Sequence, residues 1–159
     1  MRGDMNELSD LLTVDRIDAA MTASNKKGLF QQLAIAAARK TGLPAKGIAA
    51  VLNAREKASS TGFGGGAAVP HGRIEGLDDV FGYFVRLTTP IAYQSVDELP
   101  VDLVFLILSP PDAGADHLKA LAGVSRALRD RNNAAKLRGA RSRDAIFALL
   151  TASESQHAA

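Results

Sequence analysis

The chain has 159 residues, of which 47% are hydrophobic and 23% are charged, a balance typical of a single globular domain. Its 19 basic and 17 acidic residues give a net charge of +2, an excess too small to indicate a nucleic-acid-binding protein. The absence of cysteine excludes a disulfide framework and a thiolate metal site. No apolar run approaches the about 20 residues of a membrane helix, and the start of the chain lacks the apolar core of a secretory signal. We therefore expect a cytoplasmic protein that neither binds nucleic acid nor inserts into a membrane.

Helical patterns occupy the first third of the chain. Residues 8–12 have the spacing of one short helical turn, and residues 14–17 are expected to be extended. A helix is expected over residues 25–41, between a capping Ser or Asn and a terminating glycine. A second helix is expected over residues 44–56, because a proline is well suited to a helix start.

Strands are expected in the middle of the chain. Residues 80–87 alternate with apolar side chains on both faces, and residues 101–108 are almost all apolar. Strands buried on both faces are typical of a sheet that helices cover on each side. The connection over residues 88–100 is rich in turn residues and includes a candidate short strand at 91–93.

Three further helices are expected over residues 115–130, 131–138 and 142–150. The order of helices, then strands, then helices predicts a single-domain layered α/β fold, with a mixed β-sheet flanked by helices. This domain is expected to span residues 8–150, with residues 1–7 and 151–159 as flexible tails.

Basic residues gather in the last part of the chain, where Asp130 and Asp144 are interspersed with them. A solvated helical surface is therefore favoured over a binding patch. The basic residues are Arg126, Arg129, Arg131, Lys136, Arg138, Arg141 and Arg143.

The stretch from Ser59 to Gly72 joins a polar turn, a glycine-rich loop and a short apolar strand, and it ends in Pro70-His71-Gly72. Pro70 fixes its own φ and favours an extended residue before it, while Gly72 lets the backbone pass close to a neighbour. The loop is not a P-loop, because no Gly-Lys-Ser/Thr follows. It is not a dinucleotide-binding fingerprint either, because it precedes a strand instead of opening a helix.

Two other positions could carry chemistry together with or instead of His71, whereas His157, in the tail, is expected to be inert. His117 lies at the expected start of a helix, where a surface role is equally plausible from the sequence. Arg55 could cap its helix or clamp a phosphate. Two histidines with Asp116 could bind a metal, but no closely spaced ligand pair such as His-x-x-x-His supports this.

The run from Arg55 to Gly64, followed by Ala68-Val69-Pro70-His71-Gly72-Arg73, resembles the signature of the enzyme IIA proteins of the bacterial sugar phosphotransferase system. It is most similar to the fructose/mannitol type and its nitrogen-regulatory relatives. Residues 90–93, residues 100–108 and His117-Leu118 match in order and spacing, so the resemblance covers about residues 8–150.

The resemblance implies that His71 accepts a phosphoryl group on Nε2 from a histidine phosphocarrier protein. It also implies that His117 is the second active-site histidine and that Arg55 contacts the phosphate. No metal or organic cofactor is implied, and such a protein is a phosphohistidine carrier and not a conventional turnover enzyme. One departure is Gly65, where nitrogen-type relatives often have a polar residue. Supporting roles near the phosphate are expected for Ser60, Thr61, Gly62, Gly64 and Gly72.

The resemblance leaves the biological role open. A nitrogen-type regulator, whose target is unidentified, is our first hypothesis. The alternative is a sugar-transport IIA subunit that passes phosphate to a IIB component of a permease. Two alternatives come from other classes, a non-phosphorylated interaction module and a metal-dependent hydrolase. The presence of His71, His117 and Arg55 disfavours the interaction module.

Overall fold

The computed structural model describes the backbone of residues 8–158 and the side chains of residues 8–152. Residues 1–7 and 159, parts of the expected tails, lie outside the described residues. The helices are α1 (Leu8–Leu11), the 3₁₀ turn η1 (Val14–Arg16), α2 (Lys26–Thr41), α3 (Ala45–Ala58), α4 (Ala115–Arg129), α5 (Arg131–Gly139) and α6 (Arg143–Ala158). The strands are β1 (Ile17–Met21), β2 (Gly62–Gly64), β3 (Ala67–Ala68), β4 (His71–Arg73), β5 (Phe81–Ile91) and β6 (Val101–Ser109).

All six strands form one mixed sheet with β6 at its centre. The order is β1-β5-β6-β3-β2, and β4 continues beside β6 beyond β3. β5 and β6 are antiparallel, with Val85 opposite Val104, whereas β3 and β4 both run parallel to β6. Parallel pairing to one strand sets His71 opposite Ile107, near the carboxyl end of β6. The fold therefore places this histidine on the sheet itself.

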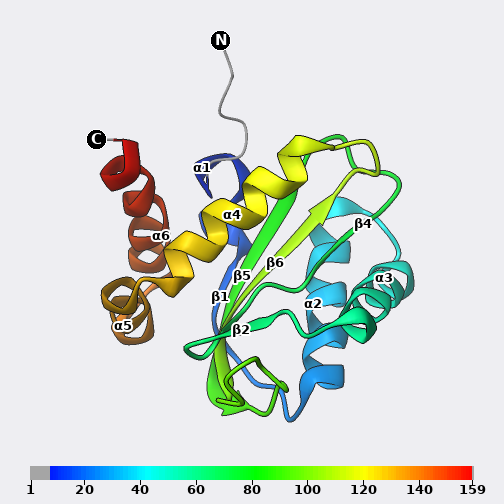
Figure 1. Cartoon of the computed structure of the whole chain (residues 1–159). Helices are drawn as coiled ribbons and strands as arrows, with labels where there is room; N and C mark the ends of the chain where they lie inside the picture. The colour runs from blue at the N-terminus through cyan, green and yellow to red at the C-terminus, as the bar shows by residue number, and fades with distance from the viewer. Residues whose placement is uncertain (1–7, 159) are drawn as a thin grey trace.

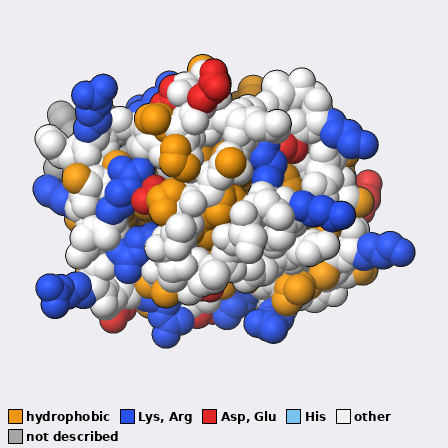
Figure 2. Space-filling view, turned by 90° about the horizontal axis from the view of Figure 1, so that it is seen from below, with side chains coloured by type: hydrophobic (Ala, Val, Ile, Leu, Met, Phe, Trp, Pro, Cys, Tyr) orange, Lys and Arg blue, Asp and Glu red, His pale blue; other side chains and the backbone are white. Residues whose placement is uncertain are grey.

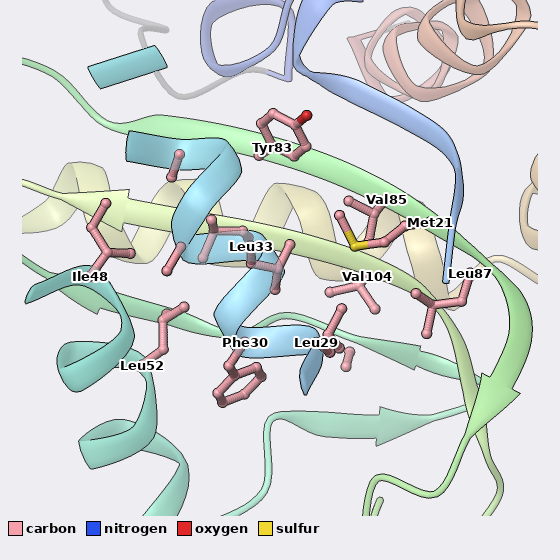
Figure 3. Packing of buried hydrophobic residues seen from close by; sticks show 14 of the residues in the cluster. Met21, Leu29, Phe30, Leu33, Ile48, Leu52, Tyr83, Val85, Leu87 and Val104 are labelled. Atoms are coloured by element: carbon pink, nitrogen blue, oxygen red, sulfur yellow. The ribbon is translucent and has the colours of Figure 1, made fainter. Parts of the chain in front are cut away.

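Helices cover both faces of the sheet (Figure 1). α2 and α3 pack on one face, where Val85 and Val104 point toward Leu29 and Leu33 (Figure 3). α1, α4, α5 and α6 pack on the other face, against residues such as Phe105. Successive side chains of β6 thus enter opposite cores, as the period of two requires. The predicted fold class, a layered α/β domain with a mixed sheet flanked by helices, is confirmed.

Local signals set the ends of α2 as predicted. The Asn25 side chain accepts a hydrogen bond from the Gly28 N–H at 2.7 Å, which caps the first turn. Gly42 follows the last turn with a φ of 80°, and its N–H donates to Ala38. Pro44 is the N-cap residue of α3, so the helix begins at Ala45, one residue after the start expected at Pro44.

Several boundaries differ from the predictions. Residues 14–16 form a 3₁₀ turn, and the first strand follows at Ile17–Met21. Its middle residues have weak strand propensity, so pairing with β5 forms this strand and the local sequence does not. β5 runs on through an irregular pairing to Ile91, opposite Val101, and absorbs part of the short strand expected at 91–93. α6 continues to Ala158, past the end expected at Leu150.

Charged and apolar side chains mix on the surface. The seven basic residues between 126 and 143 are all exposed, in agreement with a solvated helical surface. Seen from below, Lys and Arg side chains surround a central area of hydrophobic side chains (Figure 2). Among the helices described, none has the length and apolarity needed to cross a membrane.

Candidate functional site

His71 is the first residue of β4 and is half-buried. Its Nδ1 lies 2.8 Å from the carbonyl oxygen of Val69, and its Nε2 lies 3.2 Å from Nε of Arg55. A carbonyl can only accept and an arginine can only donate, so Nδ1 carries the proton and Nε2 carries the lone pair. The Pro70 turn thus selects the tautomer in which Nε2 is the nucleophilic nitrogen.

The surroundings of His71 favour the neutral ring. Burial lowers the pKa of His71 below 6.5, and the positive charge of Arg55 lowers it further. The hydrogen bond to Val69 and the charge of Glu56 oppose this shift without reversing it. At neutral pH Nε2 is therefore unprotonated, and its lone pair accepts the hydrogen bond from Arg55.

His117 lies beside His71, with ring centroids 5.5 Å apart and ring planes inclined at 53°. It belongs to the first turn of α4 and is buried, and its Nδ1 is 2.5 Å from Oγ of Ser109 at the end of β6. Burial, and after it the positive charge of Arg73, lowers the pKa of His117 to about 4. This neutral ring is thus held by a hydroxyl, and it closes one side of the site.

Arg55 lies in the last turn of α3 and contacts His71. α3 packs on the face of the sheet opposite to α4, which carries His117. Its Nη1 donates to the carbonyl oxygen of Ser59 at 2.9 Å, just after the helix ends. The same guanidinium therefore contacts both the end of the helix and His71. The remaining N–H groups of its fork are the kind of donors that bind phosphoryl oxygens.

Gly72 allows α3 to approach the sheet closely enough for this contact. A Cβ at Gly72 would overlap Cγ1 of Val51 on α3. Val51 precedes Arg55 by one helical turn, so the two side chains share a face of the helix. The glycine beside His71 thus fixes the distance between the histidine and its arginine.

Thr61 anchors the chain between α3 and β2. Its N–H and hydroxyl both donate to the Glu56 carboxylate, at 3.0 and 2.6 Å. Ser60 accepts a hydrogen bond from the Gly62 N–H at 3.1 Å. A Cβ at Gly62 would lie 2.5 Å from Oγ of Ser95, so this position has room for hydrogen only. The contacts of these three expected supporting residues hold the loop together.

The glycine turn itself lies away from the histidines. Gly64, Gly65 and Gly66 have φ values of 111°, 68° and 81°, in the region that favours glycine. Arg138 donates to the Gly65 carbonyl at 2.9 Å and also binds the Asp102 carboxylate. Because β3 pairs near Leu103 and β4 near Ile107, about 13 Å of strand separates this turn from His71. Gly64 therefore belongs to a hairpin turn held by α5 and β6.

The structure brings His71, His117 and Arg55 together from segments far apart in the sequence, with Gly72 beside them. Ser109 and Glu56 were not among the predicted site residues. Glu56 directly follows Arg55 on the last turn of α3, a position that could have drawn attention to it. Ser109 carried no comparable signal. Among the described residues, no cluster of three or more His, Cys, Asp or Glu side chains could hold a metal ion.

This mixed sheet flanked by helices is the fold of an enzyme IIA protein of known structure. Over residues 10–153 the chain matches the family described as "Phosphoenolpyruvate-dependent sugar phosphotransferase system, EIIA 2", and it belongs to this family.

Curated relatives and solved structures of high similarity carry nitrogen-regulatory names. The chain is 46% identical over 143 residues to the nitrogen regulatory protein of Bradyrhizobium diazoefficiens, covering 90% of this chain and 94% of that protein. It is 34% identical over 151 residues to the nitrogen regulatory protein of Escherichia coli, covering 93% and 91% of the two chains. The crystal structure of nitrogen regulatory protein IIA-Ntr from Neisseria meningitidis superimposes with a TM-score of 0.87 at 31% identity, covering 91% of this chain and 99% of that one.

Proposed function

We propose that this protein is a cytoplasmic phosphocarrier of the nitrogen-regulatory type, which accepts a phosphoryl group on Nε2 of His71 from a histidine phosphocarrier protein. The observation that carries the proposal is the tautomer of His71: Nδ1 is committed to the Val69 carbonyl, and the lone pair of Nε2 faces Arg55. The functional unit is residues 8–150. The regulatory role is supported by the names of the relatives, and the target protein is unidentified.

In the transfer, the P–N bond of the donor phosphohistidine breaks while Nε2 of His71 forms a new P–N bond. The donor nitrogen keeps the electron pair of the broken bond, so no proton has to leave His71. Positive charge that develops on the ring is shared with the Val69 carbonyl through Nδ1–H. No metal is needed for this balance.

Arg55 has to leave the lone pair of Nε2 before phosphorus can approach, because its Nε–H points at that nitrogen. Its guanidinium can then bind the equatorial oxygens of the loose transition state, on which the negative charge resides. His117, oriented by Ser109, supplies a second donor from the side of α4. Preorganised donors of this kind are each worth about 3–4 kcal/mol of transition-state stabilisation.

Incubation with phosphoenolpyruvate, enzyme I and the carrier protein tests the acceptor. We expect an acid-labile, base-stable phosphoprotein whose label is lost in His71→Ala. Arg55→Ala and His117→Ala should remain folded and transfer more slowly. If His71→Ala accepts phosphate with the same lability, the acceptor is another residue.

A sugar-transport role is the alternative outcome for the same chemistry. Affinity capture with the phosphorylated and unphosphorylated protein separates the two roles. Partners that bind one phosphorylation state and take up no phosphate support regulation. Transfer of the label to a sugar-specific IIB component would assign the protein to transport.

A further inference from the structure

A nearly buried carboxylate lies behind the proposed phosphoryl site. The Glu56 side chain is 9% exposed and comes from the last turn of α3. Its Oε1 accepts from the Thr61 hydroxyl at 2.6 Å. Its Oε2 accepts from the Thr61 N–H at 3.0 Å and from Nζ of Lys26 at 2.9 Å. Three donors, one from α2 and two from Thr61 just before β2, therefore converge on one carboxylate.

The hydrogen bonds around Thr61 run in one direction. The Thr61 hydroxyl has a single hydrogen, which it donates to Glu56, so the Tyr93 hydroxyl 2.7 Å away must donate to Thr61. Burial raises the pKa of Tyr93 well above its ordinary value, which keeps this phenol a donor. Lys26 lies 4.3 Å from the centre of the Tyr93 ring. The hydrogen bonds therefore run from Tyr93 to Thr61 and from Thr61 to Glu56, and this order requires the Glu56 carboxylate to accept at both oxygens.

This network controls the segment that holds Arg55. Arg55 precedes Glu56 on α3, and its Nη1 binds the Ser59 carbonyl two residues before Thr61. With Glu56 bound to Thr61, the helix terminus and the turn over residues 59–61 form one rigid unit. Without that link, the last turn of a helix frays and the Ser59 carbonyl no longer has a fixed place.

We propose that Glu56 is a positioning residue, which aims the Arg55 guanidinium at His71 by tying the end of α3 to Thr61. The inference rests on the proposed function of the site. It assigns Glu56 no contact with the phosphoryl group. Its effect passes through Arg55, so it is measurable on that side chain even when no phosphate is transferred.

Glu56→Gln is the main test, with Glu75→Gln, an exposed carboxylate in the loop after β4, as its matched control. Both Glu56 oxygens accept hydrogen bonds from Thr61. The side-chain amide introduced by Glu56→Gln would replace one of these acceptors by an NH₂ group, which can only donate. Lys26→Met controls for stability, since it removes the ion pair and leaves both bonds to Thr61 in place. Thr61→Val, which removes only the hydroxyl bond, is the second variant should Glu56→Gln fail to fold.

Two readouts are needed. In transfer assays we expect Glu56→Gln to lower the maximal rate about 10- to 100-fold with an unchanged KM for the phosphorylated carrier, the size of effect that misplacement by about 1 Å produces. Thr61→Val should fall between Glu56→Gln and the wild type. In ¹⁵N NMR spectra, the Nε–H signal of Arg55 should exchange slowly in the wild type and in Lys26→Met, and rapidly in Glu56→Gln.

The outcomes separate the two proposals. If the wild type takes no phosphate on His71, the proposed function fails, and the Arg55 signal still decides the role of Glu56. If Lys26→Met and Glu56→Gln lose rate in proportion to their stability, with the Arg55 signal unchanged, Glu56 is structural only and the inference is wrong. A wild-type rate and a wild-type Arg55 signal in folded Glu56→Gln, or in Thr61→Val where Glu56→Gln does not fold, would also overturn it.

Discussion

Gly72→Ala is the substitution whose effect the structure specifies most closely. The added Cβ would overlap Cγ1 of Val51, whereas Cβ and the carbonyl oxygen of Val51 lie at ordinary contact distances of 3.7 and 3.8 Å. Relief therefore requires a new rotamer of Val51 or a small shift of α3 away from the sheet. Overpacking of this kind costs about 1–3 kcal/mol. Because Gly72 does not have a positive φ, backbone strain adds nothing, and the lower entropy of the unfolded Ala chain offsets about 0.4–1 kcal/mol.

We expect Gly72→Ala to lower the free energy of unfolding by about 1–2 kcal/mol in urea titrations. Transfer to His71 should slow by more than this loss explains, because a shift of Val51 carries Arg55 with it. The double variant Gly72→Ala/Val51→Ala should recover most of the transfer rate, since the overlapping methyl is gone. Gly47→Ala, in the same helix with nothing within 4 Å of its added Cβ, is the control and should be neutral or stabilising.

A double-mutant cycle decides whether this reasoning is right. The single effects of Gly72→Ala and Val51→Ala should fail to add, with a coupling energy of about 1 kcal/mol in the sense of rescue. Strict additivity would show that the glycine does not set the spacing of α3 against β4. The contact between Arg55 and His71 would then not depend on Gly72.

Three further substitutions test other parts of the fold and site. As the pH drops from 6.5 through about 4, the unfolded chain protonates His117, with a pKa of 6.5, before the folded protein does, so the free energy of unfolding should fall by up to about 3 kcal/mol. In urea titrations across this range, the free energy of unfolding of His117→Gln should depend less on pH. The same pH dependence in His117→Gln and the wild type would refute the neutral ring. Arg86→Met should cost about 3 kcal/mol in thermal unfolding, because the guanidinium donates to the carbonyl oxygens of Ala19 and of the end of α5, whereas exposed Arg141→Met should change stability by less than about 0.5 kcal/mol. Gly62→Ala should cost about 2 kcal/mol by calorimetry, since its Cβ would lie 2.8 Å from the Tyr93 ring; a variant as stable as the wild type would contradict the packing described for β2.

Helices and strands whose ends are set by nearby residues were predictable from the sequence. The cap at Asn25 and the stop at Gly42 are decided within one helical turn, and the short apolar run over residues 101–108, ended by two prolines, indicates a buried strand. β1 was not predictable in the same way. Asp18 and its alanine neighbours have little strand propensity, and only the parallel partner β5 makes them extended.

The site was predictable in its residue types and not in its geometry. The residue types and the resemblance both pointed to His71, His117 and Arg55, but no sequence pattern indicates that Val69 accepts from Nδ1 or that Ser109 faces His117. Lys26 and Glu56 are 30 residues apart, and their pairing depends on how α2 and α3 pack. The glycine turn shows the opposite case. A supporting role near the phosphate was expected for Gly64, whereas the turn is held by Arg138, which also binds Asp102.

The pKa values of the two histidines are shifted in the same direction, but the two rings differ in their hydrogen-bond partners. Burial and a nearby arginine lower both pKa values, so both rings are neutral at pH 7. The distinction lies at Nδ1: His71 meets a carbonyl, which can only accept, whereas His117 meets a hydroxyl, which can donate or accept. His71 is therefore locked in one tautomer with Nε2 as the nucleophile, while His117 can change tautomer as Ser109 rotates. A ring locked in this way suits the acceptor, and a ring free to present a donor or an acceptor suits the residue that stabilises a passing phosphoryl group.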